Sequence, residues 1–392
     1  MEDCIKGICF TVLSRLSRLI MNKLRIAAYG GFRWIPPKVG TAGSDKFAFE
    51  LYPRIVKRGH TLVAYCRIYP GDNDIQLSGY EGIKLKYYKT VNKAGFDTLF
   101  HSAKATFDVI FRNTADVVHL HSGANSIWAI LLRIAGKRVV ISQFAMDWKR
   151  DKWPWYGKLF YIFSNYITAY IPNKVAFDNV YTKEYFERKF KRSYNFIPYG
   201  SEVKIPPSNI DILNKIGLQK NEYFLFVGRF IPDKGLHLLI EAFEKLKTNK
   251  KLVLIGGSPN PSEYELKIKK TSDSRIIFPG YVYGDDTNIL IQNAFSYIQP
   301  SLIEGLSPVI LTVMALGTPL ICSDIIENIF ITKSNAVHFA SGNANSLIEK
   351  LQYALNNKEV ILSNAEHGKT DVSKRFNWEN ITDQYIDLLK KL

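Results

Sequence analysis

Short apolar runs alternate with amphipathic segments along nearly the whole chain. The runs read as strands at 24–30, 60–66, 116–121, 138–142, 223–228, 251–257, 275–278, 294–298 and 319–322. The amphipathic segments predict helices at 45–57, 127–134, 237–246, 308–316 and 378–389. Continuous apolar runs of this length are typical of strands in a parallel sheet that is covered on both faces. Their alternation with helices therefore predicts βαβ units.

This rhythm stops and restarts near residue 200, which predicts two doubly wound domains. We expect an N-terminal segment at 1–23, a first domain at 24–200, a second domain at 201–375, and a C-terminal helix at 376–392 that packs back on the first domain. A length of 392 residues fits more than one domain. In doubly wound folds ligands bind beyond the carboxyl ends of the strands, so we expect the domains to face each other across a ligand-binding cleft.

Charge is distributed unevenly between the two predicted domains. Residues 1–200 hold 31 Lys and Arg against 15 Asp and Glu, whereas residues 201–392 hold 21 of each, so the whole net charge of +16 lies in the first half. Such asymmetry indicates that the first half meets a polyanion: nucleic acid, an anionic membrane or a phosphorylated substrate. Helix-turn-helix, zinc-module and RNA-binding signatures are absent from the sequence, which disfavours nucleic acid.

Residues 1–23 place apolar side chains at helical spacing, interrupted by Arg15 and Arg18. These arginines break the apolar core that a secretory signal requires. An amphipathic helix on a membrane surface fits the pattern better, with a helix packed on the domain as the alternative. No apolar run of 18 residues occurs, so no membrane-spanning segment is predicted.

The sequence gives little sign of a metal site or of disulfide bonds. The four cysteines are scattered and form no C-x-x-C pair, which favours a reducing, cytoplasmic compartment. The single D-x-D, at 72–74, lies in a hydrophilic stretch. We expect no metal and no cofactor.

A G-R-x-x-x-x-K-G stretch follows the strand expected at 223–228. Gly228 allows a tight turn, and Arg229 and Lys234 then project two cations from a loop that precedes a helix. Two cations beside backbone N–H groups suit a diphosphate, although a solvated loop with a fortuitous pair is the alternative.

A second stretch places a carboxylate before a helix. Glu304 and Gly305 precede Leu306, Ser307 and Pro308, and proline is favoured in a first helical turn. The helix N-terminus offers a further anion site. Glu304 would repel a phosphate, so we expect it to accept hydrogen bonds from sugar hydroxyls or, alternatively, to cap the helix.

Together the two stretches resemble retaining GT-B glycosyltransferases of the family 4 type, whose patterns are a G-R-x-x-x-x-K-G loop and an E-x7-E segment. The likeness spans nearly the whole chain. The first half resembles a branch of polysaccharide glycosyltransferases that includes rhamnosyltransferases. The matching segments are 34–40, 58–60, 117–123, 147–153 and 196–200.

This resemblance implies a GT-B fold and a nucleotide-diphospho-sugar donor held by the second domain. Arg229 and Lys234 would neutralise the departing diphosphate, and Glu304 would touch the donor sugar. Val282 would lie by the base. Other donor-binding positions implied or expected are Gly228, Gly305, Leu306, Ser307 and Thr312. Such enzymes generally need no catalytic metal.

Thr312 departs from the family pattern. It stands eight residues after Glu304, where the family has a second glutamate that accepts hydrogen bonds from ribose. A lost charged hydrogen bond would weaken nucleotide binding by about 10- to 100-fold. We therefore expect weaker nucleotide binding, a compensating contact or reduced activity.

Candidate residues of the first domain lie at the expected strand ends. His119 and His121 point to one face of a strand, and we expect at least one of them to contact the donor sugar or the leaving phosphate, with paired core histidines as the alternative. We assign His121 to the catalytic set. Acceptor-side candidates are Gly43, Asp45, Asp147, Trp148, Lys149 and Arg150.

The resulting hypothesis is a retaining, metal-independent transferase that moves a sugar from a nucleotide diphosphate to a hydroxyl of a lipid-linked saccharide in surface polysaccharide biosynthesis. It would work as a peripheral protein at the anionic inner face of the membrane. The alternatives are a catalytically weakened binding or scaffold protein and a GT-B sugar epimerase.

Overall fold

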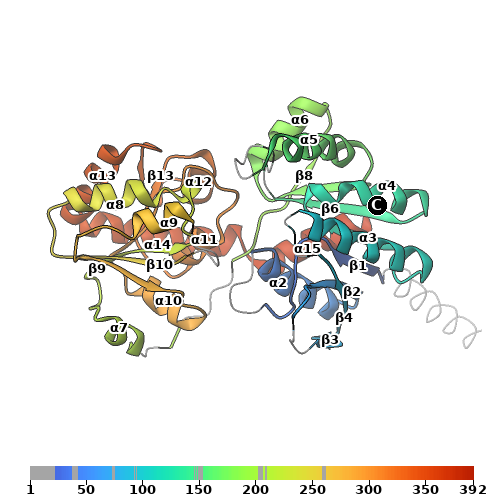
Figure 1. Ribbon diagram of the computed structural model, residues 1–392, viewed down its shortest axis with the longest axis horizontal. Helices are drawn as coiled ribbons and strands as arrows, with labels where there is room; N and C mark the ends of the chain where they lie inside the picture. The colour runs from blue at the N-terminus through green and yellow to red at the C-terminus, as the bar shows by residue number, and fades with distance from the viewer. Residues whose placement is uncertain are drawn as a thin grey trace, which may run out of the picture. The chain divides into compact units, whose positions relative to one another are not determined.

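The computed structural model describes residues 23–37, 43–72, 76–91, 93, 95–144, 146, 148, 153–201, 206–207, 210–257 and 262–392. The chain divides into two compact units (Figure 1). Unit 1 comprises the residues up to Ile197 together with Glu379–Leu392, and unit 2 comprises Pro198–Trp378. The expected amphipathic segment at 1–23 lies outside the described residues, apart from Lys23.

Unit 1 is built on an eight-stranded sheet of order β3-β4-β2-β1-β5-β6-β7-β8. All neighbouring strands are parallel except β3, which pairs antiparallel with β4. The strands are β1 (Arg25–Tyr29), β2 (Thr61–Ile68), β3 (Gly79–Tyr80), β4 (Ile83–Lys89), β5 (Val117–His121), β6 (Arg138–Gln143), β7 (Lys174–Phe177) and β8 (Asn195–Phe196). The apolar run of β5 is fully buried, as expected for a strand covered on both faces.

Helices connect these strands by crossovers. They are α2 (Gly43–Lys57), α3 (Phe96–Phe111), the short 3₁₀ turn η1 (Gly123–Ser126), α4 (Ile127–Ile134), α5 (Trp155–Tyr170) and α6 (Val180–Phe190). Because parallel crossovers are right-handed, α3, α4, α5 and α6 cover one face of the sheet and α2 covers the other.

The C-terminal helix α15 (Trp378–Lys390) belongs almost entirely to unit 1. Glu379 accepts hydrogen bonds from Arg54 Nε at 2.9 Å and from Arg58 Nη2 at 2.8 Å, and both arginines lie at the end of α2. The buried ring of Tyr385 reaches the core of the unit.

Unit 2 has a six-stranded parallel sheet of order β11-β10-β9-β12-β13-β14. Its strands are β9 (Tyr223–Gly228), β10 (Lys251–Gly256), β11 (Ile276–Gly280), β12 (Ser296–Gln299), β13 (Leu320–Ser323) and β14 (Val337–Phe339). The order reverses between β9 and β12. This switch point is where open α/β sheets bind ligands.

The helical elements of unit 2 follow its strands in turn. They are α7 (Asp211–Ile216), η3 (Pro232–Lys234), α8 (Leu236–Lys245), α9 (Glu263–Ile268), α10 (Asp285–Gln292), α11 (Pro308–Ala315), α12 (Ile326–Thr332), α13 (Ala344–Asn356) and α14 (Lys358–Arg375). Phe224, Phe243 and Leu347 belong to an apolar core that joins β9 to α8 and α13. In the described residues, no helix is long and apolar enough to span a membrane.

The predicted α/β class with two doubly wound domains is confirmed. Each strand expected from the sequence exists, to within a few residues at its ends. The pairing of β3 with β4, and the helices α5, α6, α13 and α14, were not among the expected elements.

Candidate functional site

The first loop of the site follows β9 in unit 2, and glycines shape it. A Cβ on Gly256, paired with Gly228 on the next strand, would lie 1.9 Å from the Gly228 carbonyl oxygen. Gly235 has φ +67°, and its Cβ would lie 2.1 Å from the carbonyl oxygen of Pro300. Only glycine fits such contacts without moving backbone. The loop that carries Arg229 and Lys234 is therefore packed tightly against the segment after β12.

The two cations of this loop have different environments. Arg229 is exposed and has no side-chain partner among the described residues. Lys234 forms an ion pair with Glu304, and the two side chains are only 18% and 10% exposed. The loop thus presents one unpaired cation and one neutralised cation.

Glu304 is held through one of its two carboxylate oxygens. Oε1 accepts hydrogen bonds from Lys234 Nζ, from Gln299 Nε2 at 2.7 Å and from Ser301 Oγ at 2.8 Å. Oε2 has no partner among the residues that the structure describes. Three donors on one oxygen fix the orientation of the carboxylate and leave the other oxygen as an available acceptor.

Buried polar groups on β9 and β12 help to hold the Glu304 carboxylate in this orientation. The hydroxyl of Tyr297 donates to the Val227 carbonyl at 3.1 Å and lies 3.1 Å from Gln299 Oε1. Gln299 in turn donates to Ser301 Oγ at 2.8 Å. Burial raises the pKa of Tyr297 far above its usual value, which keeps its hydroxyl protonated. A continuous network therefore joins the end of β9 to Glu304.

Helix α11 begins directly after this loop, at Ser307 and Pro308. Pro308 occupies the first helical turn, and the side chain of the N-cap Ser307 makes no capping hydrogen bond. Leu306 and Ser307 are buried, and Gly305 is half-buried. Thr312, one turn further on, donates its hydroxyl to the Pro308 carbonyl at 3.1 Å. The hydroxyl at the position of the second family glutamate is thus engaged within its own helix.

Val282 lies in the connection between β11 and α10, half-buried, and its carbonyl accepts a hydrogen bond from Thr287 Oγ1 at 2.8 Å. Its neighbours Tyr281 and Tyr283 are exposed and stack with ring centroids 5.7 Å apart. The Tyr281 ring also lies where a Cβ on Gly257 would contact it at 3.5 Å. A flat aromatic surface therefore stands beside the carboxyl ends of β10 and β11.

In unit 1, His119 and His121 lie on the same face of β5, with ring centroids 4.7 Å apart, and both are fully buried. The Tyr52 hydroxyl bridges His119 Nδ1, at 3.1 Å, and His121 Nε2. Burial lowers the pKa of His119 to about 3 and that of His121 well below its usual value, so both rings are neutral. This is the geometry of paired core histidines. His121 Nδ1 has no hydrogen-bond partner among the described residues, and the ligand contact expected from the sequence stays a prediction.

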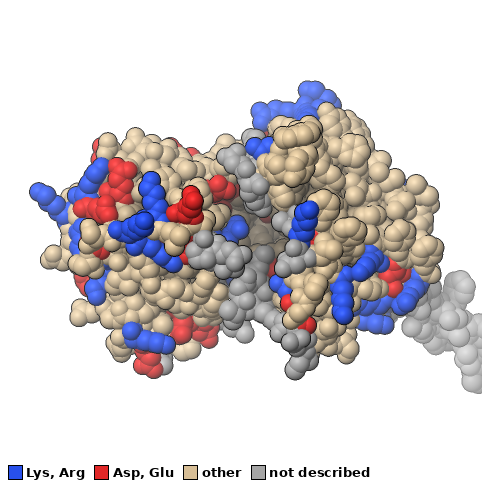
Figure 2. All heavy atoms as spheres, in the orientation of Figure 1, with Lys and Arg blue, Asp and Glu red and all other residues tan. Residues whose placement is uncertain are grey.

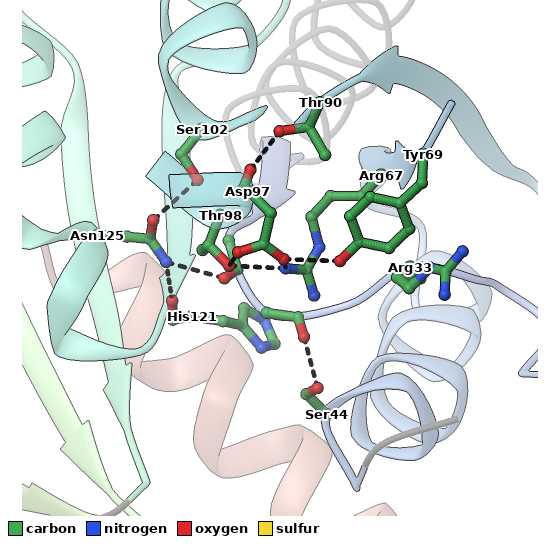
Figure 3. A network of polar contacts seen from close by, with 12 residues as sticks. Arg33, Ser44, Arg67, Tyr69, Thr90, Asp97, Thr98, Ser102, His121 and Asn125 are labelled. Carbon is green, nitrogen blue, oxygen red and sulfur yellow. Dashed lines mark hydrogen bonds and ion pairs between the residues drawn. The ribbon is translucent and has the colours of Figure 1, made fainter. Parts of the chain in front are cut away.

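Polar groups fasten the loop after β1 to the loops after β5 (Figure 3). Asn125 in η1 donates to the Gly30 carbonyl at 2.8 Å and to the His121 carbonyl at 2.6 Å. Asp45 is buried, and its Oδ1 accepts from the backbone N–H groups of Arg33, at 2.6 Å, and Trp34, at 2.9 Å. The Asp45 carboxylate therefore holds the backbone of this loop. This structural role was not part of its prediction as an acceptor-side residue.

The remaining acceptor-side candidates are only partly described. Gly43 is the exposed first residue of α2, and Trp148 packs against Tyr185 with ring centroids 5.3 Å apart. Asp147, Lys149 and Arg150 lie outside the described residues, so their roles stay predictions.

Among the residues that the structure describes, no group of three or more His, Cys, Asp or Glu side chains gathers where a metal ion could bind. Of the D-x-D stretch only Asp72 is described, and it forms an ion pair with Arg33 at 2.8 Å.

Sequence reasoning missed the residues that position Glu304. Tyr297, Gln299 and Ser301 occupy alternate positions in the segment before Glu304. In a strand that continued through 301 they would therefore share one face. Polar side chains at the end of an otherwise apolar strand were the available signal.

Comparison with known proteins supports the resemblance to glycosyltransferases that the sequence of unit 2 shows. Residues 209–370 match the family model described as Glycosyl transferases group 1. Unit 2 is therefore similar to a group 1 glycosyltransferase domain. The matched residues include both loops of the candidate site, from Gly228 through Thr312. The branch that includes rhamnosyltransferases is not identified by the comparisons.

Relatives of the chain include an uncharacterized glycosyltransferase of Methanocaldococcus jannaschii, which is 31% identical over 52% of this chain and 54% of its own length. The O-antigen chain mannosyltransferase C of Escherichia coli is 26% identical over 58% of this chain and 60% of its own length. The chain thus spans about half to three-fifths of the length of these curated relatives.

Solved structures extend the likeness of fold to the whole chain. Sucrose-phosphate synthase from Thermosynechococcus elongatus superposes with a TM-score of 0.78 at 19% identity, covering 93% of this chain and 98% of that one. HepE of Anabaena, solved in complex with UDP-glucose, gives a TM-score of 0.75 at 14% identity, covering 94% and 100%. The fold of the chain is the GT-B fold of two Rossmann-like domains, as the sequence predicted.

Proposed function

We propose that this protein is a retaining glycosyltransferase that takes a sugar from a nucleotide-diphosphate donor. The observation that carries the proposal is the anchoring of Glu304. Three donors, Lys234 among them, hold its Oε1, and its Oε2 is left as an acceptor in the loop that leads into α11. In the proposed complex Oε2 accepts hydrogen bonds from hydroxyls of the donor sugar.

Arg229 and Lys234 supply the positive charge for the leaving group. As the bond between the anomeric carbon and the diphosphate oxygen breaks, negative charge grows on that oxygen, and prepositioned cations stabilise it. The N–H groups at the start of α11 add a partial positive charge. The proposed reaction thus needs neither a metal nor a cofactor.

The acceptor is proposed to be a hydroxyl of a lipid-linked saccharide in surface polysaccharide synthesis. Its oxygen bonds to the anomeric carbon on the face that the diphosphate leaves, and its proton passes to the departing phosphate. Among the relatives are proteins named for O-antigen and lipopolysaccharide synthesis, which supports this acceptor class. The basic balance of residues 1–200 supports work at the inner face of an anionic membrane.

The test is a panel of nucleotide sugars with released nucleoside diphosphate and thermal stabilisation as the readouts. We expect one donor to stabilise the protein and to be turned over, and Arg229→Ala to lower turnover by orders of magnitude with an unchanged melting temperature. Lys220→Ala, an exposed lysine of the same unit outside the site, is the matched control. Near-normal turnover by Arg229→Ala would contradict the proposal.

Thr312 favours a second candidate, a catalytically weakened GT-B protein that binds a nucleotide and holds a partner. Its hydroxyl is used by the Pro308 carbonyl, and a hydroxyl is a weaker acceptor than the glutamate of the family pattern. Nucleotide-dependent stabilisation without turnover of any donor in the panel would support this candidate over the first.

A further inference from the structure

Three neighbouring helices of unit 1 each expose an apolar stripe to solvent. On α3 the stripe includes Phe100 and Phe111, on α4 Ile134, and on α5 Trp155 and Phe163. Within α3 and α5 the exposed residues recur at spacings of four, seven or three, which places them on one side of each helix. We call the set the aromatic face: Phe96, Phe100, Phe107, Phe111, Ile130, Leu131, Ile134, Trp155, Tyr156, Leu159, Phe163, Tyr166 and Tyr170.

The exposure of this face is large. Phe111 is 80% exposed, Ile134 79% and Trp155 73%. Isolated apolar side chains are common on protein surfaces, but a contiguous patch of this kind marks an interaction site.

The three stripes lie side by side. Helix α4 packs against both α3 and α5. The right-handed crossovers place all three helices on the same face of the unit 1 sheet. Figure 2 shows a broad surface without charged residues over α4 and α5, with Lys and Arg near its edges.

Within α3, α4 and α5 the exposed charges are of one sign. Helices α3, α4 and α5 contain two acidic residues, and both are buried in ion pairs: Asp97 with Arg67 at 2.8 Å, and Asp108 with Lys86. Cations stand at the borders of the aromatic face with their charged groups over exposed rings. Lys93 lies 5.1 Å from the centroid of Phe96, Lys189 5.1 Å from that of Tyr166, and Arg192 5.3 Å from that of Tyr170.

We propose that the aromatic face docks on the surface of an anionic lipid bilayer. Phenylalanine and isoleucine side chains would enter the boundary between headgroups and acyl chains, and the Tyr and Trp rings suit the headgroup level. The bordering lysines and arginine would meet lipid phosphates. A second copy of this chain is a poor occupant, because face-to-face contact would bring together the like charges of α3, α4 and α5 and of the bordering Lys93, Lys189 and Arg192.

This inference assigns the membrane contact to a described surface of the fold, separate from residues 1–22. It rests on the proposed function in one respect: the proposed lipid-linked acceptor would place the enzyme at a bilayer. Docking itself requires neither donor nor acceptor.

The test is sedimentation of the full chain with vesicles of phosphatidylcholine and phosphatidylglycerol, without nucleotide. The double variant Phe111→Ser, Ile134→Ser should weaken binding by about tenfold or more, because both side chains are exposed in the free protein and buried in lipid. Val360→Ser, Leu362→Ser removes two exposed apolar residues from α14 of unit 2 and is the matched control, for which we expect no change. Brominated lipids should quench tryptophan fluorescence in the native chain, and Trp155→Phe should remove most of the quenching.

Other outcomes would overturn the proposal. Unchanged vesicle binding by the Phe111→Ser, Ile134→Ser variant, with loss of binding only on deletion of residues 1–22, would assign the contact to that segment. Self-association in the absence of lipid that this variant abolishes would assign the face to a second copy. Nucleoside diphosphate release measured without vesicles tests the proposed function separately, so the two can fail independently.

Discussion

Gly235 offers a direct test of how the cation loop is fixed to the Glu304 loop. It stands directly after Lys234, at the N-cap of α8, with φ +67° and ψ 20°. The substitution Gly235→Ala adds one methyl group. Gly217→Ala is a matched control in the same unit, because Gly217 caps α7 with φ +70° and ψ 41° and has no atom within 4 Å of its added Cβ.

The expected magnitudes differ because the surroundings differ. An alanine in the left-handed region costs about 1 kcal/mol of folding free energy, and Gly217→Ala should show this cost alone. In Gly235→Ala the methyl group would also lie 2.1 Å from the Pro300 carbonyl oxygen, which is backbone and cannot rotate away. Overpacking of this kind costs about 1–3 kcal/mol more. The total for Gly235→Ala is therefore about 2–4 kcal/mol.

The backbone can relieve this overlap only by separating the two loops. Leu302 N donates to the Asp233 carbonyl at 2.8 Å, so a shift of the 300–302 segment strains that bond and moves Glu304 relative to Lys234. We expect Gly235→Ala to lose donor-induced stabilisation as well as folding free energy.

Urea unfolding of both variants measures the free energies, and thermal shift with the best donor from the nucleotide-sugar panel measures binding. We expect Gly217→Ala to bind the donor as the native chain does. Equal unfolding free energies for the two variants would refute the packing argument, since their backbone strain is matched.

Three further predictions concern the site and the buried histidines. Glu304→Gln should lower kcat/KM by about 10- to 100-fold, because it removes a charged acceptor while its amide oxygen can keep the contact with Ser301. Steady-state kinetics would measure this, and an unchanged kcat/KM would exclude the contact between Glu304 and the donor sugar. Thr312→Glu should tighten nucleotide binding by about 10- to 100-fold in calorimetry, and weaker binding would show that the hydroxyl of Thr312 is itself a ligand contact. Burial lowers the pKa values of His101 and His119 to about 3, and that of His121 well below its usual value, so the unfolded chain binds more protons below about pH 6.5. The contribution of these three histidines to stability is therefore full above that pH and falls by up to about 4 kcal/mol for each pH unit below it. The loss ends near pH 3 for His101 and His119. Urea unfolding at pH 7.5 and 5.5 measures it, and His101→Leu should remove about a third of this contribution; equal stabilities at the two pH values would contradict the prediction.

The strands were predictable because burial on both faces leaves continuous apolar runs such as those of β5 and β9. The order of the strands was not, because it depends on long-range pairing such as that of β1 with β5, which local patterns do not encode. Helix α5 was missed for a related reason. Its apolar residues occupy both its buried and its exposed sides, so it lacks the polar face by which an amphipathic helix is recognised.

The site was predictable to the level of motifs but not of partners. Gly235 was found as part of a pattern, yet its function depends on the Pro300 carbonyl, 65 positions further along the chain. Asp45 was chosen for its charge and position, but its carboxylate accepts from the backbone N–H groups of Arg33 and Trp34. Spacing locates such residues on strand ends and loops, whereas the direction of a side chain is decided by the fold around it.

The contact between Lys234 and Glu304 changes how the two loops act together. From the sequence, Lys234 was a phosphate ligand and Glu304 a sugar ligand, each acting alone. In the structure they neutralise each other. Among the described residues, the loop that we propose binds a diphosphate therefore carries one unpaired positive charge, on Arg229. Lys234 can contribute to a diphosphate without leaving Glu304, because an ammonium group has three N–H donors and the carboxylate needs one. In the proposed complex the same lysine therefore joins the leaving group to the carboxylate that holds the sugar. Removing Lys234 should weaken both contacts at once, whereas removing Arg229 should weaken only the contact with the diphosphate.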